Sequence, residues 1–329
     1  MSDPVLRVED LHVTFPGREG DVRAVRGVSY ALKRGEILGI VGESGSGKSA
    51  CAQAVMGLLP SSARVSGSVR LGDDELVGLD DRGLSRVRGE RISMIFQDPL
   101  SALTPVYTVG DQIAEAIRSH HGVTREAAAQ RAVALLELVG IPQAARRARA
   151  FPHEFSGGMR QRVMIAMALA LDPEVLIADE PTTALDVTIQ AQILRLLENL
   201  NRDRNLSVVL ITHDLGVVAE LADRVVVMYG GQIVEDATLD EIFYNPQHPY
   251  TWGLLGSIAR LDEPRPERLT QIAGQPPSLL TPPTGCRFAA RCKYAFDKCT
   301  QPPALEARLG DATHLDRCWL TPAEKLESR

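Results

Sequence analysis

The sequence contains no hydrophobic run long enough to cross a lipid bilayer. The longest apolar run in the middle of the chain, Val163–Leu171, covers about half of a bilayer span. The first ten residues lack the basic start and the apolar stretch of a secretory signal peptide. The net charge of -6 also lacks the basic excess typical of nucleic-acid-binding domains. We therefore expect a cytoplasmic protein that has no nucleic-acid partner and meets a membrane only through another protein.

Cysteine is nearly absent before residue 286. Cys51 is the exception, and we expect it to be a small buried thiol on a helix. The remaining cysteines are Cys286, Cys292, Cys299 and Cys318. Disulfides are not expected in a cytoplasmic protein, and the spacing lacks the paired C-x2-C units typical of structural zinc. Three alternatives stay open for these thiols: an iron–sulfur cluster with four cysteine ligands, a zinc site, or no ligand.

The composition is that of an ordinary globular protein, with 44% hydrophobic and 24% charged residues in 329 positions. This length allows one large domain or two ordinary ones. Strands and turns are predicted between Leu6 and Leu76. Near-continuous apolar strands then alternate with helices, which predicts an α/β protein with a parallel sheet covered on both faces. The predicted strands are Ile37–Val41, Ile92–Phe96, Val175–Ala178, Val208–Ile211 and Arg224–Met228.

The segment Asp98–Leu171 is predicted to be helical and to interrupt the strand pattern as an inserted subdomain. Within it, Thr124 can cap a helix that carries Glu126 in its first turn. Gly140 and Pro142 should end that helix, because neither residue continues one well.

The last segment, from about Asn245, is rich in proline and is expected to be extended and irregular. The prolines that carry this expectation are Pro264, Pro266, Pro276, Pro277, Pro282 and Pro283.

Gly42–Ser49 follows the phosphate-binding pattern Gly-x-x-x-x-Gly-Lys-Ser. It stands between a predicted strand and a helix expected from Lys48 to about Leu59, where Pro60 stops it, and a chance glycine-rich turn would lack this placement. The glycines allow backbone N–H groups to curl around a phosphate at the positive end of the helix. Lys48 would reach the β- and γ-phosphates, and Ser49 would coordinate Mg²⁺. The residues predicted to bind ATP here are Gly42, Ser44, Gly45, Ser46, Gly47, Lys48, Ser49 and Ala50.

Asp179 and Glu180 follow the apolar residues of the strand that begins at Val175. We expect Asp179 to hold Mg²⁺ through its water shell and Glu180 to polarise the attacking water as the catalytic base. An Asp-Glu pair by itself is more often a solvated turn, but the strand before it and the phosphate loop upstream favour the catalytic interpretation. The two motifs together predict nucleotide hydrolysis.

The segment Phe-Ser-Gly-Gly-Met-Arg-Gln-Arg at Phe155–Arg162 resembles the signature sequence of the ABC-type ATPases. Met159 stands where that family usually has Gln, and we infer no loss of activity from this departure. The resemblance implies that two ATPase subunits pack head to tail. Ser156, Gly157 and Gly158 of one subunit would then act on the nucleotide that the other subunit holds.

Further motifs follow in the order that this family shows. Thr183–Asp186 resembles the D-loop, so Asp186 would also act across the dimer. Gln97 resembles the Q-loop glutamine, which implies a role in binding ATP and Mg²⁺. His213 resembles the catalytic switch histidine, and Phe15 stands where an aromatic ring stacks on adenine.

The resemblance implies a phosphate-loop NTPase core, with a RecA-like parallel sheet and an antiparallel N-terminal β subdomain. The helical subdomain, about residues 98–171, would be inserted in an ATPase domain of residues 1–244. Residues 245–329 would form a small irregular C-terminal extension.

The branch of the family is indicated by the extension. Asn245–Thr251, with the proline-rich chain and cysteines after it, resembles the extension of dipeptide, oligopeptide and nickel importer ATPases, and the region Ile95–Val106 fits the same branch. This implies an ATPase that energises import of di- or oligopeptides from the cytoplasmic face of the cell membrane. Its partners would be two transmembrane permeases, an extracytoplasmic solute-binding protein and a second, paralogous ATPase. An importer of nickel or another small solute, and an ABC ATPase outside import, stay open as alternatives.

The cysteine tail of this branch is associated with a four-iron four-sulfur cluster. The resemblance therefore favours that cluster, with zinc as the alternative, at Cys286, Cys292, Cys299 and Cys318. His314 is a possible substitute ligand, although we expect it to be a surface residue.

Overall fold

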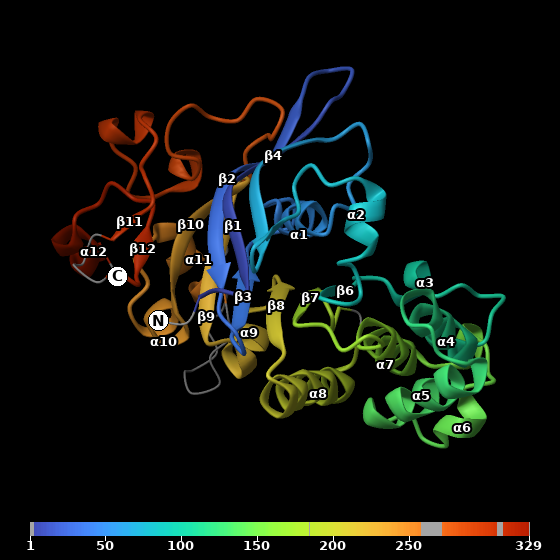
Figure 1. Ribbon diagram of the computed structural model, residues 1–329. Coiled ribbons are helices and arrows are strands. Elements are labelled where there is room, and N and C mark those ends of the chain that lie inside the picture. The colour runs from blue at the N-terminus through green and yellow to red at the C-terminus, as the bar shows by residue number, and fades with distance from the viewer. Residues whose placement is uncertain (1–2, 184, 258–271, 308–311, 329) are drawn as a thin grey trace. The chain divides into compact units, whose positions relative to one another are not determined.

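The computed structural model describes residues 3–183, 185–257, 272–307 and 312–328 (Figure 1). Its chain forms two compact units. The first contains Met1–Val5, Leu32–Glu36 and Gly78–Leu210, and the second contains Leu6–Ala31, Ile37–Val77 and Ile211–Arg329.

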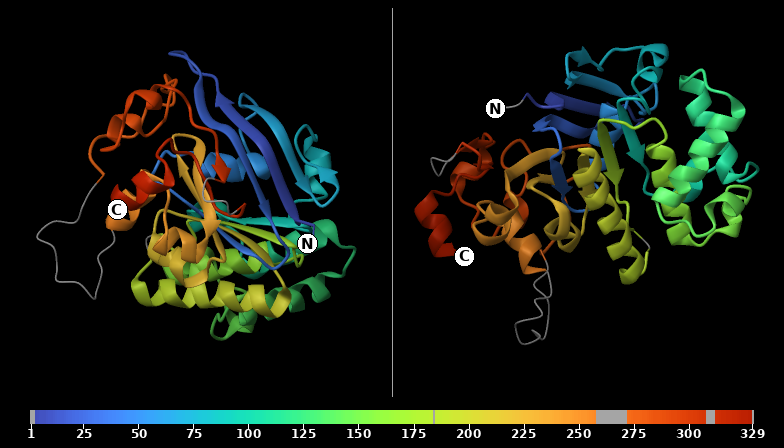
Figure 2. Two further views of the ribbon diagram at one scale, coloured as in Figure 1. Left: turned by 90° about the vertical axis from the view of Figure 1, so that its left-hand side faces the viewer. Right: turned by 60° about the horizontal axis from the view of Figure 1, so that its bottom comes forward.

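An antiparallel sheet near the N-terminus belongs to the second unit. Its strand order is β2-β1-β4-β5, and Figure 2 shows the long dark-blue strands β1 and β2 side by side. Along β1 the residues alternate, so that Leu6, Val8 and Val13 are buried, as expected for a sheet with one covered face. The antiparallel N-terminal subdomain is therefore confirmed. Its strands are β1 (Leu6–Phe15), β2 (Val22–Leu32), β4 (Arg64–Leu71) and β5 (Asp74–Glu75).

A second group of strands in this unit begins with the parallel pair β3 and β9. All five residues of β3 are buried, which explains its unbroken apolar sequence. The order continues β9-β10-β12-β11, so two short strands from near the C-terminus extend the sheet. The strands are β3 (Ile37–Val41), β9 (Arg224–Tyr229), β10 (Gln232–Thr238), β11 (Glu306–Ala307) and β12 (Leu315–Asp316).

Helix α1 (Lys48–Val55) is shorter than the sequence predicts. Gly57 has a φ of 61°, and the N–H of Leu58 donates to the carbonyl of Gln53 at 2.8 Å. A left-handed glycine with this hydrogen bond satisfies the last carbonyls of a helix. Gly57 therefore ends the helix, and the assignment of its end to Leu59 and Pro60 is wrong.

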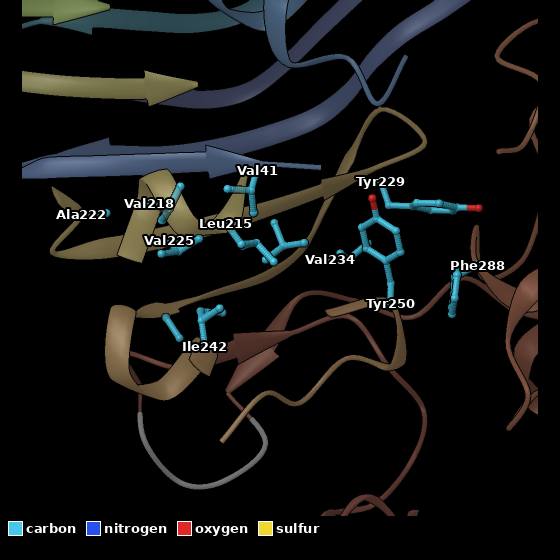
Figure 3. Packing of buried hydrophobic residues seen from close by; sticks show 12 residues of the cluster. Val41, Leu215, Val218, Ala222, Val225, Tyr229, Val234, Ile242, Tyr250 and Phe288 are labelled. Carbon is cyan, nitrogen blue, oxygen red and sulfur yellow. The ribbon is translucent and has the colours of Figure 1, made fainter. Parts of the chain in front are cut away.

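The C-terminal part of the chain shares the core of this sheet. Tyr229 on β9, Tyr250 on α11 (Pro249–Gly256) and Phe288 belong to one buried cluster, and their rings lie together in Figure 3. The ring centroids of Tyr229 lie 4.5 Å from Tyr250 and 5.3 Å from Phe288. Aromatic pairs at such distances stabilise a core beyond the area that they bury. This segment is therefore held by the sheet and does not need a core of its own.

The extension contains helices that the sequence pattern did not predict, α11 and α12. Pro276, Pro277, Pro282 and Pro283 lie in chain without helix or strand, as expected, whereas Pro264 and Pro266 lie outside the described residues. The remaining helices of this unit are α9 (Leu215–Leu221), α10 (Leu239–Tyr244), α11 (Pro249–Gly256) and α12 (Pro322–Ser328).

The first unit holds the parallel pair β6 (Ile92–Ile95) and β7 (Val175–Asp179). The strand β8 (Ser207–Thr212) is the other neighbour of β7, and its first four residues, up to Leu210, belong to this unit. The predicted strands at these positions and at β3 and β9 are thus confirmed.

The helical segment lies between β6 and β7 in the sequence, as predicted. Helices α4, α5 and α6 lie together in Figure 1, and α7 packs on α4 and α5. The Thr124 hydroxyl accepts the N–H of Ala127 at 3.2 Å and so begins α5 where expected. The helices of the unit are α2 (Asp81–Ser85), α3 (Pro99–Ala102), α4 (Val109–His120), α5 (Arg125–Leu138), α6 (Ala144–Arg147), α7 (Gly157–Ala168) and α8 (Val187–Arg204).

Within the described ranges, every helix is too short or too polar to span a membrane.

Candidate functional site

The phosphate loop joins β3 to α1 and needs glycine for steric reasons. A Cβ on Gly42, whose φ is 154°, would lie 2.2 Å from the carbonyl oxygen of Met228. A Cβ on Gly47, whose φ is 100°, would lie 2.4 Å from the carbonyl oxygen of Ala24. At Gly45 a Cβ would meet no atom within 4 Å. The loop is thus packed tightly at both ends and open in its middle, where an anion can approach the backbone.

Lys48 folds back over this loop. Its Nζ donates to the carbonyl oxygens of Gly42 at 2.7 Å and Glu43 at 3.1 Å, and the residue is only 5% exposed. A phosphate oxygen bears more charge than a carbonyl and forms a stronger hydrogen bond with an ammonium group. The side chain is therefore placed where an incoming phosphate can take over its hydrogen bonds. Ser44 and Gly45 are exposed beside it, and Ser49 and Ala50 are half-buried on α1.

Two residues of the C-terminal part of the chain hold the phosphate loop at Glu43. The hydroxyl of Tyr250 accepts the N–H of Glu43 at 2.8 Å. Arg291 donates to both carboxylate oxygens of Glu43, at 2.7 and 3.0 Å. Neither contact could be predicted from the sequence, because the nucleotide-binding pattern leaves the identity of this loop position open.

Phe15 and His213 belong to the same unit as the phosphate loop. Phe15 is the last residue of β1 and is half-buried, as a ring available for stacking would be. His213 follows β8 directly and is exposed.

Asp179 and Glu180 lie in the first unit, at the end of β7. Asp179 is 4% exposed. Glu180 has a φ of 49°, a left-handed conformation that residues other than glycine rarely adopt. Such strain often marks a functional position.

The carboxylate of Glu180 is oriented by two donors. Gln97 Nε2 donates to Glu180 Oε2 at 3.0 Å, and Thr183 Oγ1 donates to the same oxygen at 2.8 Å. The structure therefore brings together two predicted site residues, Gln97 and Glu180. The sequence predicted Thr183 only as part of the D-loop and did not predict that it orients Glu180. A hydroxyl three residues after the carboxylate was the signal that could have revealed this role.

The signature segment opens helix α7 in the same unit. Ser156 is the N-cap residue, yet its hydroxyl forms no capping hydrogen bond with the described residues. Ser156 and Gly157 are exposed. A Cβ on Gly158 would lie 2.5 Å from Ile189 Cγ2 on α8, so glycine is needed here for packing. The exposed helix start, with its positive dipole end, is able to receive an anion.

Asp186 acts as the N-cap of α8. Its carboxylate accepts the N–H of Ile189 at 3.0 Å. Ala184, in the middle of the predicted D-loop, lies outside the described residues. The predicted site is thus divided between the units, with Gln97, Asp179, Glu180, Ser156 and Asp186 in the first.

The four late cysteines meet in the second unit. Cys286, Cys292, Cys299 and Cys318 all line one small cavity. Burial raises the pKa of Cys292 to about 11 and that of Cys318 to about 12. In the described part of the chain, no group of three or more His, Cys, Asp or Glu residues is placed to hold a metal ion. Cys51, by contrast, is a buried thiol on α1, as predicted.

His314 is not the surface residue that the sequence suggested. It is 2% exposed, and its Nε2 lies 2.9 Å from Glu235 Oε1. Its Nδ1 is hydrogen-bonded to the carboxylate of Glu241. His314 is also absent from the lining of the cysteine cavity. The expectation of a surface position is therefore wrong, because two acidic residues on β10 and α10 draw the imidazole into the protein.

Comparison with known proteins places these features in a family. Residues 25–183 match the ABC transporter family, and residues 234–299 match the family described as "Oligopeptide/dipeptide transporter, C-terminal region". The oligopeptide transport ATP-binding protein OppD of Bacillus subtilis is 53% identical over 96% of this chain and 88% of its own length. The dipeptide transport ATP-binding protein DppD of the same organism is 53% identical over 97% of this chain and 95% of its own length.

The similarity extends to a longer relative and to a solved structure. OppD of Mycobacterium tuberculosis is 58% identical over 92% of this chain, which spans only about half (50%) of that relative's length. The dimeric ATP-binding cassette MJ0796, bound to ADP and phosphate, aligns with a TM-score of 0.65 and 30% identity. The alignment covers 71% of this chain and 98% of that cassette. This chain therefore belongs to the ATP-binding subunits of the ABC transporters, in the branch of oligopeptide and dipeptide transport ATP-binding proteins.

Proposed function

We propose that this chain hydrolyses ATP to energise the import of di- or oligopeptides across a membrane. The observation that carries the proposal is the combination of nucleotide and peptide-transport features in one chain. A phosphate loop with its lysine and a carboxylate oriented by Gln97 and Thr183 precede a C-terminal region of the peptide-transporter type. The B. subtilis relatives, similar over nearly their whole lengths, are named for oligopeptide and dipeptide transport.

In this mechanism the chain's own residues bind ATP and prepare water for attack. The open side of the phosphate loop and Lys48 would hold the phosphates, and Phe15 would stack on adenine. Glu180 would take a proton from the attacking water, and His213 would contact the γ-phosphate. Ser49, Gln97 and Asp179 would supply oxygen donors of the kind that Mg²⁺ prefers, and the ion would neutralise charge on the phosphates.

Hydrolysis would require two ATPase subunits. Ser156, Gly157 and Gly158 present an exposed helix start, which would cap the γ-phosphate bound by the partner subunit. Asp186, at the start of α8, would face the same interface. The partner subunit would be a paralogue of this chain.

The remaining partners would be two transmembrane permeases and an extracytoplasmic solute-binding protein, with this chain at the cytoplasmic face of the membrane. Residues 1–244 would act as the ATPase domain and residues 245–329 as the extension. A nickel or other small-solute importer is the second candidate, because Asn245–Thr251 also resembles the extension of nickel importer ATPases.

Uptake into proteoliposomes tests the choice of solute. The assembled transporter, with its solute-binding protein, should take up a labelled di- or oligopeptide when ATP is supplied on the side of this chain. The same peptide should stimulate ATP hydrolysis. Stimulation by nickel ions, without any response to peptides, would refute peptide import and favour the second candidate.

The cysteine cavity is proposed to hold a four-iron four-sulfur cluster. Four thiols line one cavity, and four cysteines are the usual ligands of such a cluster. A zinc ion held by the same thiolates is the alternative. The role of the cluster here would be structural, tying together a segment with little core of its own.

Anaerobic purification tests this metal centre. The protein should be brown, with broad absorption near ~400 nm that bleaches with dithionite. Cys292→Ser should remove the colour. A colourless anaerobic preparation that contains stoichiometric zinc would show that the thiols bind zinc, and one that contains neither metal would show that they bind no metal.

A further inference from the structure

The first variable residue of the phosphate loop, Glu43, is bound on two sides by the C-terminal extension. Arg291 forms a parallel pair of hydrogen bonds, NH1 to Oε2 at 2.7 Å and NH2 to Oε1 at 3.0 Å. Tyr250 accepts the backbone N–H of the same residue at 2.8 Å. Bidentate arginine–carboxylate pairs fix geometry as well as adding energy. Both the side chain and the backbone of Glu43 are therefore held.

Arg291 is itself held by further hydrogen bonds. Its guanidinium also donates to the carbonyls of Ala273 at 2.9 Å and Ile272 at 3.1 Å, and to the hydroxyl of Tyr229 at 3.3 Å. The side chain is 6% exposed. The hydrogen bonds to Glu43 raise the pKa of Arg291, so the guanidinium stays charged. This pair differs from surface ion pairs, which contribute little because both side chains move freely.

Glu43 in turn holds the groups that would meet phosphate. Its carbonyl oxygen accepts from Lys48 Nζ at 3.1 Å and from the N–H of Ser46 at 3.2 Å. A shift of the Glu43 backbone would therefore move the carbonyl that positions the lysine and the turn that follows it. A continuous series of contacts leads from the extension to the ammonium group.

We infer that Arg291 and Tyr250 are positioning residues for ATP binding, which makes the C-terminal extension a brace on the phosphate loop. They hold Glu43 so that the loop keeps its phosphate-binding shape before nucleotide arrives. A preorganised site binds its ligand more tightly because less ordering is needed on binding. The inference rests on the proposed ATP-binding function. It adds that the affinity for nucleotide depends on Arg291 and Tyr250, which lie outside the nucleotide motifs.

Equilibrium binding of a fluorescent ATP analogue with Mg²⁺ to the full chain tests the inference. Arg291→Gln should weaken binding about tenfold, because it removes two charge-assisted hydrogen bonds. Tyr250→Phe should weaken it about threefold, because it removes one hydroxyl and keeps the ring in its aromatic cluster. Arg291→Lys should recover part of the loss, since lysine keeps the charge without the bidentate geometry.

Steady-state hydrolysis by the assembled transporter separates positioning from catalysis. The KM for ATP should rise in Arg291→Gln and Tyr250→Phe by factors similar to the binding losses. The kcat should stay within about twofold, because Glu180 and its donors are untouched. A fall in kcat with unchanged KM would contradict the inference.

Arg317→Gln is the matched control. Arg317 anchors the same extension through the carbonyls of Ile233 at 2.7 Å and Pro303 at 3.1 Å, so its loss loosens the extension without removing a contact to Glu43. ATP binding should then stay near that of the wild type. Equal weakening by Arg317→Gln and Arg291→Gln would refute the positioning role.

A double-mutant cycle completes the test. Glu43→Gln together with Arg291→Gln should bind ATP no more weakly than the worse single variant, because both changes remove the same pair. Fully additive losses would contradict the inference, as would wild-type affinity in both Arg291→Gln and Tyr250→Phe. Failure of the wild-type chain to bind the analogue would refute the proposed function and the inference together.

Discussion

At the scale of single residues, the Glu180 carboxylate has a defined orientation. Gln97 and Thr183 donate to the same oxygen, Oε2, and the backbone of Glu180 adopts a left-handed conformation. Backbone strain of this kind costs on the order of 1–3 kcal/mol. The proposed catalytic role explains why this strained conformation occurs directly after a buried strand, since the Glu180 carboxylate must face a nucleotide and a water molecule.

Glu180→Gln should retain ATP binding and lose hydrolysis. Glutamine keeps the shape and can still form hydrogen bonds, but it cannot accept a proton from water, so the rate should fall by about 10²–10⁴. Phosphate release by the assembled transporter measures the change, and the ATP-bound dimer should accumulate on size-exclusion chromatography. Lys48→Ala provides the contrast, since it should weaken nucleotide binding itself. Near-wild-type hydrolysis by Glu180→Gln would show that another group is the base.

Thr183 should matter through its hydroxyl. Thr183→Val keeps the branched shape but removes the donor to Glu180 Oε2, so kcat should fall about tenfold as the carboxylate loses one orienting hydrogen bond. Thr183→Ser retains the hydroxyl and should behave like the wild type. Equal activity of the valine and serine variants would mean that the hydrogen bond has no part in catalysis.

At the scale of elements, a buried carboxylate joins β10 to α11 and β12. Glu235 is 0% exposed and accepts from the N–H groups of Gln247 and His248. It also accepts from the hydroxyl of Thr251 and is hydrogen-bonded to His314. Because a buried carboxylate without partners is costly, these donors hold the start of α11 and the chain before β12 to the sheet.

His314 gives this junction a pH dependence. Burial alone would lower the pKa of His314, but the carboxylates of Glu235 and Glu241 outweigh it and raise the pKa above its usual value. A raised pKa in the folded state stabilises the protein fully below the unfolded-state pKa of about 6.5. That stabilisation is lost as the pH rises through the folded-state pKa.

His314→Gln should therefore destabilise the protein more at pH 6 than at pH 9, because glutamine can form a hydrogen bond but carries no charge. Urea unfolding midpoints of both proteins, measured across this range, give the difference. Burial and the charge of Lys325 lower the pKa of His248 to about 3, so the effect of His248 on stability has the opposite pH dependence. Because His248 is present in both the wild type and the variant, its effect cancels in the comparison. A difference between the proteins that stays constant with pH would refute a charged His314.

At the scale of the whole molecule, the helical segment after Gln97 offers apolar surface for a partner. Leu100, Val106 and Tyr107 are 56%, 71% and 57% exposed. They lie in the sequence between Gln97, which holds Glu180, and the signature at Ser156. We propose that a permease binds here, where it would sense movements of both residues and so couple closure of the ATPase to transport.

Val106→Asp should reduce peptide uptake while the ATPase subunits retain basal hydrolysis. The charge disrupts an apolar contact and touches no residue of the nucleotide motifs. Uptake and ATP hydrolysis measured on the same proteoliposomes provide the comparison, with Val123→Asp, an exposed valine before α5, as the matched control. Unimpaired uptake by Val106→Asp, or equal loss in both variants, would refute docking at this segment.

The sequence by itself determined the features that depend on residues close to one another in the chain. The phosphate loop, the strand before Asp179 and the Thr124 cap each depend on neighbouring residues and on backbone geometry, so their positions could be predicted. The end of α1 was mispredicted because the left-handed glycine at Gly57 acts before Pro60. The domain boundary at residue 245 stays a prediction.

Only the tertiary structure decided which distant side chains meet. Arg291 and Glu43 are 248 residues apart in the sequence, and His314 is 79 residues from Glu235. No local pattern identifies such partners, because their pairing depends on how β9, β10 and α11 pack and on which polar groups become buried together. A buried polar group needs a hydrogen-bond partner. The packing of the extension therefore decided that Arg291 and Tyr250 bond to Glu43 of the phosphate loop.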